Sequence, residues 1–265
     1  MPYIELPAGR FFYREDGPED AEPLLLSNSL GTDHTMWDAQ IPALTRQFRV
    51  VRYDGRGHGA SAVPVGPYTI ADLGQDVVAL YEALGIQRAH FCGLSLGGMV
   101  GMWLAANAPE RVDRLALCNT AARLGPPEYW DARIEAVRAG GMSAIVSAVL
   151  ARWFTGAFMS QFPTEIERVR QVFANTPATG YIACCEAIRD MDQRASLPRI
   201  QTQTLVIAGA FDAATPPEDN RFLATSIPNA HYEELPTAHL SNIEAAAAFT
   251  DAVMFAITDH KDVYC

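Results

Sequence analysis

The chain has 265 residues, 49% of them hydrophobic, and a formal net charge of −11 at pH 7. This length is enough for one large domain with a substantial buried core. The acidic balance argues against nucleic acid or an anionic membrane as a partner, and no apolar run is long enough to cross a bilayer. Residues 1–5 lack a basic and an apolar region, so we expect no signal peptide.

Short apolar runs alternate with amphipathic stretches along most of the chain. We predict strands at residues 10–14, 24–26, 48–53, 89–92, 112–119, 203–209 and 230–235. We predict helices at residues 36–44, 70–84, 99–107, 218–226 and 243–257, an early hairpin at the turn-rich residues 16–20, and a loose tail from residue 259. This alternation predicts an α/β fold with a doubly wound, mostly parallel sheet, in which ligands bind at the carboxyl ends of the strands.

The alternation stops at residue 121 and resumes after residue 197. The segment between has helical periodicity, several aromatic residues and no convincing strand, so we read it as a helical insertion into a core of residues 1–120 and 198–265. It holds eight arginines and eight acidic residues, and the rest of the chain therefore carries the net negative charge. An anionic substrate would meet less repulsion at this insertion than at the core.

The five cysteines are odd in number and lack the spacing of a zinc site: Cys92, Cys118, Cys184, Cys185 and Cys265. Cys92 and Cys118 lie in predicted strands, which favours reduced core residues rather than disulfides. We therefore expect a reducing compartment, such as the cytoplasm, and no metal ion.

Residues 93–97 form the pattern Gly-x-Ser-x-Gly, with a predicted strand before Ser95 and a predicted helix after it. A sharp turn from strand to helix strains such a serine and requires small neighbours, here Gly93, Gly97 and Gly98. The N-terminus of the following helix favours negative charge that develops beside the serine. The pattern also occurs by chance in flexible glycine-rich loops, but its context favours Ser95 as a nucleophile.

A serine nucleophile needs a base within hydrogen-bond reach, and histidine is the usual choice. His239 follows the last predicted strand, has small flanking residues and precedes a predicted helix. The other five histidines fit less well: two lie within strands (His90, His231), one lies in the tail (His260), and two follow earlier strands, where they could still lie near the site (His34, His58). We therefore predict His239 as the general base.

The base needs a third group to orient it. Asp212 lies in the loop after the strand at 203–209, although an Asx turn or a helix cap would also explain an aspartate there. The other suitable loop, after the strand at 112–119, holds Asn119 and Thr120 and no acid. We predict Asp212 as the orienting acid.

The order Ser95, Asp212, His239 is that of the α/β-hydrolase fold, which the whole chain resembles. More narrowly, the chain is similar to the 3-oxoadipate enol-lactonases of bacterial aromatic degradation. The stretches that carry this resemblance are SNSLGT at 27–32, YDGRGHG at 53–59, CGLSLGG at 92–98 and AHLSNIE at 238–244, with RWF at 152–154. The resemblance implies a helical cap, residues 121–197, inserted after the sixth strand. It also implies an oxyanion hole made by the backbone amides of Leu30 and Leu96.

This resemblance implies hydrolysis of a small anionic enol-lactone without a cofactor or metal. Ser95 would attack the lactone carbonyl while His239 takes its proton, and water would then release 3-oxoadipate. Two alternatives remain open. One is another capped hydrolase, such as a carboxylesterase, a carbon–carbon hydrolase or a perhydrolase. The other is a non-catalytic small-molecule receptor, because a fold does not determine a function.

The arginines of the insertion are candidates to bind the substrate's carboxylate, because a guanidinium matches a carboxylate with two parallel hydrogen bonds. Arg133 is our first candidate and Arg152 our second, with Trp153 as an apolar wall. Alternatively, both arginines are solvated helix-face charges paired with acids such as Asp131 or Glu135, and Trp153 is an ordinary packing residue.

Overall fold

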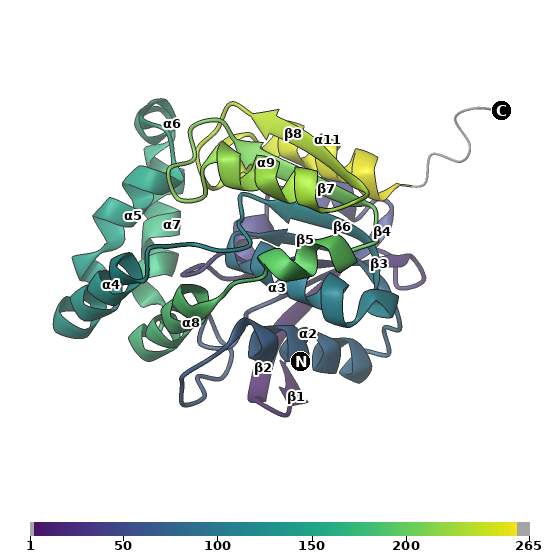
Figure 1. The fold of residues 1–265 in the computed structure, drawn as a ribbon, viewed down its shortest axis with the longest axis horizontal. Helices are drawn as coiled ribbons and strands as arrows, with labels where there is room; N and C mark the ends of the chain where they lie inside the picture. Colours follow the sequence, from purple (N-terminus) through teal and green to yellow (C-terminus); the bar gives the residue numbers. More distant parts are fainter. Residues whose placement is uncertain (1–2, 259–265) are drawn as a thin grey trace.

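One eight-stranded sheet runs through the protein, and Figure 1 shows it together with the surrounding helices. The structure is a computed structural model that describes residues 3–258. The strands of this part are β1 (Tyr3–Leu6), β2 (Gly9–Asp16), β3 (Glu22–Ser27), β4 (Phe48–Tyr53), β5 (Ala89–Leu94), β6 (Val112–Cys118), β7 (Thr204–Gly209) and β8 (Ala230–Leu235). Their order in the sheet is β1-β2-β4-β3-β5-β6-β7-β8. Only the pairings of β2 with β1 and β4 are antiparallel among these strands.

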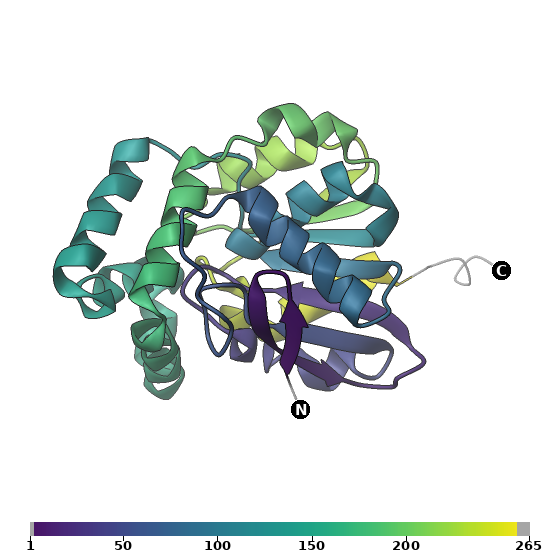
Figure 2. The same ribbon diagram turned by 90° about the horizontal axis from the view of Figure 1, so that it is seen from below.

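Helices cover both faces of the sheet, as apolar central strands require. All six residues of β5 and of β7 are buried, which is typical of parallel strands between two helical layers. One face packs against α2 (Ile70–Ala83), α3 (Leu96–Asn107) and α9 (Pro217–Ser226), and the other against α1 (Ile41–Leu44) and α11 (Ala246–Ile257) (Figures 1 and 2). The predicted doubly wound, mostly parallel sheet is confirmed.

The N-terminal hairpin differs from the prediction. It joins β1 to β2, with Gly9 at a positive φ of 121° at the start of the second strand. The turn-rich residues 16–20 connect β2 to β3 instead, and β4 lies between these two strands in the sheet. The predicted hairpin is wrong because turn residues indicate a reversal of the chain but do not determine which strand becomes its neighbour.

Two predicted helices are divided. Residues 36–44 contain the end of a 3₁₀ helix, His34–Trp37, and α1, and the last predicted helix contains the end of α10 (Ser241–Glu244) and α11. Between α10 and α11, Ala245 leaves the helical region with φ −127° and ψ 53°. The remaining 3₁₀ helices of the described residues are Pro109–Arg111, Met142–Ala144 and Arg194–Arg199. The predicted tail from residue 259 lies outside the described residues.

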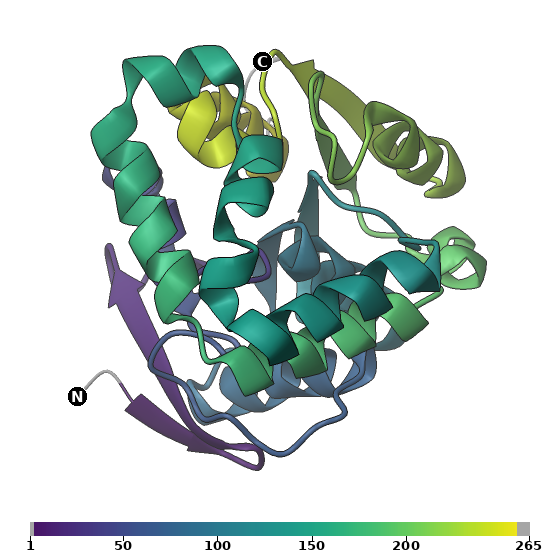
Figure 3. The ribbon, with the colours of Figure 1, turned by 90° about the vertical axis from the view of Figure 1, so that its left-hand side faces the viewer.

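Five helices gather at one end of the sheet, at the left of Figure 1 and facing the viewer in Figure 3. They are α4 (Pro127–Gly140), α5 (Val146–Trp153), α6 (Gly156–Gln161), α7 (Pro163–Asn175) and α8 (Ala178–Asp190). Residues 121–197, all of which the structure describes, contain no strand. The predicted boundaries of a separate cap, 121–197, remain a prediction, but these helices follow β6 and lie over the strand ends that carry Ser95 and His239.

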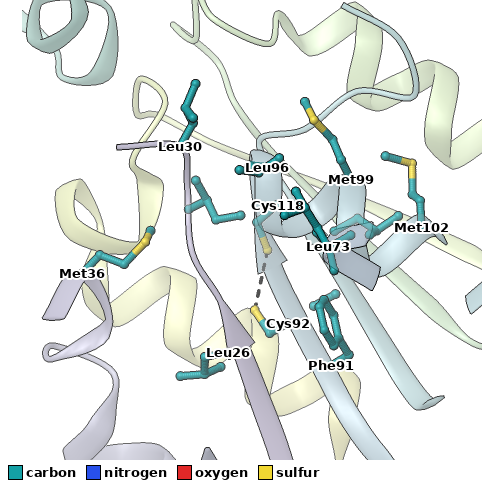
Figure 4. Close-up of a cluster of buried hydrophobic side chains, with 14 of the residues drawn as sticks. Leu26, Leu30, Met36, Leu73, Phe91, Cys92, Leu96, Met99, Met102 and Cys118 are labelled. Carbon is teal, nitrogen blue, oxygen red and sulfur yellow. Dashed lines mark hydrogen bonds between the residues drawn. The ribbon is translucent and has the colours of Figure 1, made fainter. Parts of the chain in front are cut away.

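Apolar packing supports this end of the sheet from below. Figure 4 shows Cys92 and Cys118, on the neighbouring strands β5 and β6, beneath Leu96 at the start of α3. Both cysteines are fully buried and reduced, with their sulfur atoms 3.9 Å apart. In the same view Leu30 lies beyond the end of β3, which carries Leu26. The end of β3 and the start of α3 therefore rest on one close-packed layer, which limits their movement.

Candidate active site

Ser95 lies in the turn between β5 and α3 with a strained backbone, φ 57° and ψ −115°. A positive φ is unfavourable for a residue with a side chain and persists only where neighbouring groups hold it. Here the Ser95 N–H donates to the carbonyl of Cys118 at 2.9 Å, and the hydroxyl of Thr120 donates to the Ser95 carbonyl at 2.7 Å. Both partners come from the end of β6, so the sheet itself holds the turn.

The glycines around Ser95 are required by close backbone contacts. A Cβ atom on Gly93 would lie 2.2 Å from the carbonyl oxygen of Gly97, and one on Gly97 would lie 2.1 Å from the carbonyl oxygen of Ser27. No side chain fits at such distances. The Gly-x-Ser-x-Gly pattern is therefore a packing requirement of this turn, as the sequence predicts.

His239 contacts Asp212 through its Nδ1 atom, which lies 2.8 Å from Asp212 Oδ2. Both side chains are buried. An ionised carboxylate only accepts hydrogen bonds, so this contact requires the proton on Nδ1 and leaves Nε2 as the basic nitrogen of the neutral ring. The structure thus brings the predicted base and acid together, and Ser95 and His239 line the same cavity.

The surroundings of Asp212 favour its ionised form. Burial raises its pKa, but the proximity of His239 and the hydrogen bonds from His239 and Thr215 outweigh burial, and the pKa lies below its usual value. Asp212 Oδ1 accepts the backbone N–H groups of Ala214 at 2.7 Å and Thr215 at 3.0 Å. Asp212 therefore forms the Asx turn that was considered as an alternative, and it also contacts His239. The turn holds the carboxylate toward the His239 ring.

Asn119 is a site residue that the sequence prediction missed. It is fully buried at a positive φ of 45°, and its Nδ2 donates to Asp212 Oδ2 at 3.0 Å. Its Oδ1 accepts the hydroxyl of Ser241, from the segment that follows His239. A polar residue directly after β6 was the available signal, since loops at strand ends meet at this edge of the sheet.

The backbone amides of Leu30 and Leu96 have no hydrogen-bond acceptor within residues 3–258, although the amides on both sides of each are bonded. The N–H groups of Ser95 and Gly97 donate to the carbonyls of Cys118 and Asn28. Those beside Leu30 donate to Met36 Sδ and His58 Nε2, at 3.3 Å and 2.8 Å. Two unpaired amides on the two loops that flank the nucleophile are the arrangement that an oxyanion requires.

A cavity lies between this edge of the sheet and helices α4, α5 and α8. Ser95, His239 and Leu30 line it from the core, and Arg133, Arg152 and Trp153 line it from the helices. No aspartate or glutamate is among the described lining residues. The cavity therefore has two cationic side chains, mostly apolar walls and no anionic group, and is suited to a small anionic ligand.

The acids considered as partners of Arg133 pair elsewhere. Asp131 pairs with Arg189 at 2.8 Å, and Glu135 pairs with Arg138 at 2.7 Å. Arg133 instead donates from Nε to the hydroxyl of Tyr181 at 2.7 Å, and no carboxylate of the described residues lies within salt-bridge distance of it. The helix-face alternative for Arg133 therefore fails, since its charge is not neutralised in this part of the chain.

Arg152 also binds neutral groups, namely the hydroxyl of Tyr129 and the backbone carbonyl of Ala213 at 2.5 Å. Trp153 is buried and its ring stacks at 6.5 Å and 28° on the ring of His239. Its backbone carbonyl accepts the N–H of Leu240 at 3.1 Å. Arg152 and Trp153 thus join α5 to the loops of Asp212 and His239 while lining the cavity.

Other candidate sites are not supported in the described part of the chain. Within residues 3–258, no group of three or more His, Cys, Asp or Glu side chains could hold a metal ion. In the same residues, no helix combines the length and the apolar character needed to cross a membrane.

The geometry agrees with comparisons to known proteins. A sequence profile of the alpha/beta hydrolase fold matches residues 22–246. The chain belongs to the α/β-hydrolase fold family. This family's characteristic serine turn and chain order of serine, acid and histidine are those found here.

Several relatives of this α/β-hydrolase are named as enol-lactonases or esterases. The chain is 44% identical over 241 residues to 3-oxoadipate enol-lactonase 2 of Acinetobacter baylyi, covering 91% of this chain and 90% of the relative. The crystal structure of the enol-lactonase from Burkholderia xenovorans matches with a TM-score of 0.96 and 48% identity, covering 97% of this chain and 100% of that one. A thermophilic esterase from Thermogutta terrifontis matches with a TM-score of 0.89 and 31% identity, covering 96% of each chain.

Proposed function

We propose that this α/β-hydrolase opens the lactone ring of 3-oxoadipate enol-lactone to give 3-oxoadipate. The observation that carries the proposal is one cavity that joins Ser95 and His239 to two arginines without carboxylate partners among the described residues. The similarity to enol-lactonases over about nine-tenths of the chain supports the same substrate class.

In the proposed first step, Ser95 Oγ attacks the lactone carbonyl carbon and its proton moves to His239 Nε2. Asp212 holds the ring of His239 in the required tautomer and stabilises its cationic form. The carbonyl oxygen becomes an oxyanion, which accepts the N–H groups of Leu30 and Leu96. The ring carbon–oxygen bond then breaks, and the departing enol oxygen takes the proton from His239.

The second step hydrolyses the acyl-enzyme. Water attacks the ester carbonyl of acylated Ser95, and His239 takes a proton from this water and returns it to Ser95 Oγ as the ester bond breaks. The enol of the released product tautomerises to the ketone. Neither step requires a group other than these side chains, the two amides and water.

We propose Arg133 as the main ligand of the substrate's carboxylate. Its guanidinium lies 5.5 Å from the ring centroids of both Trp130 and Tyr181, which orient it without neutralising it. Only its Nε and Nη1 donate within the described residues, so Nη2 is left for an anion. Arg152 is the second ligand, and Trp153 supplies an apolar wall beside His239.

The acidic composition and buried thiols support two further parts of the proposal. A net charge of −11 disfavours nucleic acid and anionic membranes as partners. Four cysteines of the described residues are buried and reduced, which favours a cytoplasmic location.

A coupled assay with freshly generated 3-oxoadipate enol-lactone tests the proposed function. The wild-type protein should hydrolyse the lactone faster, in kcat/KM, than p-nitrophenyl acetate, and Ser95→Ala should abolish both activities. Turnover of p-nitrophenyl acetate without turnover of the lactone would identify another esterase. Turnover of neither would favour a receptor.

A further inference from the structure

Gly31 follows Leu30 in the loop after β3, and its amide N–H is bound within the protein. It donates to Nε2 of His58 at 2.8 Å. His58 lies in the buried turn after β4, and its Nδ1 is 3.2 Å from the carbonyl of Arg56. A ring that accepts through Nε2 and donates through Nδ1 is a neutral histidine with one defined tautomer.

This contact fixes the peptide plane on the C-terminal side of Leu30. The Gly31 N–H shares that plane with the Leu30 carbonyl, whereas the Leu30 N–H belongs to the preceding plane. That preceding plane also holds the Ser29 carbonyl, which accepts the N–H of Thr32 at 3.2 Å and the hydroxyl of Thr32 at 2.8 Å. The direction of the Leu30 N–H therefore depends on the shape of the turn at residues 29–32, and His58 holds this turn from outside through the Gly31 amide.

Gly31 needs such an anchor because its backbone is intrinsically free. Its φ is +79°, and a Cβ atom there would lie 2.6 Å from the ring of Phe173 in α7, so only glycine fits. The hydroxyl of Thr176 donates to the Gly31 carbonyl at 3.3 Å, but it also donates to the Val172 carbonyl at 3.2 Å. A shared bond at this distance is weak, and His58 provides the stronger hold.

We propose that His58 is a positioning residue for the oxyanion hole: its Nε2 binds the Gly31 N–H and so aims the Leu30 N–H at the oxyanion. This rests on the proposed function, in which the Leu30 amide stabilises the oxyanion. His58 acts through the loop: it is not among the residues that line the cavity of Ser95 and His239, and it lines another cavity, beside Tyr53 and Arg56.

Two substitutions separate this role from simple packing. His58→Phe keeps the ring shape but leaves the Gly31 N–H without an acceptor. His58→Gln keeps an uncharged acceptor near the position of Nε2 and is the conservative rescue. His90→Phe is the matched control, because His90 is also a buried histidine but lies in β5 away from the loop.

Each variant is assayed at about pH 8, above the ordinary pKa of histidine, with p-nitrophenyl acetate and with 1,1,1-trifluoroacetone as inhibitor. Ser95 adds to the ketone carbonyl and forms a tetrahedral oxyanion, so the affinity for this ketone reports on the oxyanion hole directly. His58→Phe should lower kcat by about ten- to a hundredfold with KM within about twofold, and should weaken the ketone in parallel. His58→Gln should stay within about threefold of the wild type, and His90→Phe should match it.

If His58→Phe does not fold, Thr176→Val removes the hydroxyl that holds the next peptide, between Gly31 and Thr32, and should lower kcat and ketone affinity together, by a few fold. The proposal is overturned if His58→Phe keeps full kcat, if His58→Gln is as impaired as His58→Phe, or if kcat falls while ketone affinity does not. Ser95→Ala in the same assays distinguishes the two failures, because an active Ser95→Ala would overturn the proposed function rather than the role of His58.

Discussion

Replacing Arg133 by methionine removes the positive charge from the cavity and keeps an unbranched apolar side chain between Trp130 and Tyr181. We expect this variant to lose most of its preference for a substrate with a free carboxylate. The reason is that Arg133 has no acidic partner among the described residues, so a bound carboxylate is its natural counter-ion. In wild type the free-acid lactone should therefore bind and react better than its methyl ester.

The magnitude follows from the site. A hydrogen bond to a charged group contributes about 1.5–3 kcal/mol. Two unit charges about 5 Å apart, at the effective dielectric constant of about 20 for partly buried pairs, attract by about 3 kcal/mol, which is of the same order. At about 1.4 kcal/mol for each factor of ten, Arg133→Met should lower kcat/KM for the acid by about ten- to a hundredfold. The methyl ester should change by less than about threefold.

The assay compares the free-acid enol-lactone with its methyl ester on the wild type and three variants. Arg138→Met is the matched control: it lies on the same helix, but it is exposed and paired with Glu135, so neither substrate should be affected. Tyr181→Phe removes the hydrogen bond to Arg133 without removing the charge and should have a smaller effect. An equal loss for acid and ester in Arg133→Met, or no loss for either, would refute the reasoning and place the carboxylate elsewhere.

Three further predictions concern the catalytic side chains and His58. In steady-state kinetics, Ser95→Ala and His239→Ala should each lower kcat by several orders of magnitude, and the double variant should lower it by little more. Near-normal turnover by His239→Ala would exclude His239 as the base. Asp212→Asn should lower kcat by about 10³–10⁴ in the same kinetic assays, because the amide favours the wrong tautomer of His239. Burial lowers the pKa of His58, outweighing its bond to the Arg56 carbonyl and the nearby carboxylates, so the unfolded chain binds this proton more readily. The free energy of unfolding should therefore decrease as pH falls below about 6.5, and less steeply in His58→Gln; urea titrations that show parallel profiles would contradict this.

The sequence by itself determined the parts that depend on local pattern. Apolar runs and helical periodicity predicted the mostly parallel sheet. A strand that is buried on both faces is a continuous apolar run, whereas a helix that is buried on one face repeats its apolar residues at helical spacing. The glycines around Ser95 predicted its turn, since their contacts are with residues at most a few positions away or with the adjacent strand. The positions of Asp212 and His239 after successive strands predicted that they meet, because parallel strands end at the same edge.

Only the tertiary structure decided which side chains are already bound to one another. Asp131 and Glu135 are near Arg133 in the sequence, yet they pair with Arg189 and Arg138, which leaves Arg133 free of carboxylates within the described residues. Likewise, Asn119 donates to Asp212, which is 93 positions away in the sequence. The N-terminal hairpin joins β1 to β2 and so precedes the turn at residues 16–20 that the sequence indicates. A local pattern specifies a conformation and a buried face. The partner of a polar group depends on which distant element packs beside it, and the competition between several possible partners is settled only when the chain is folded.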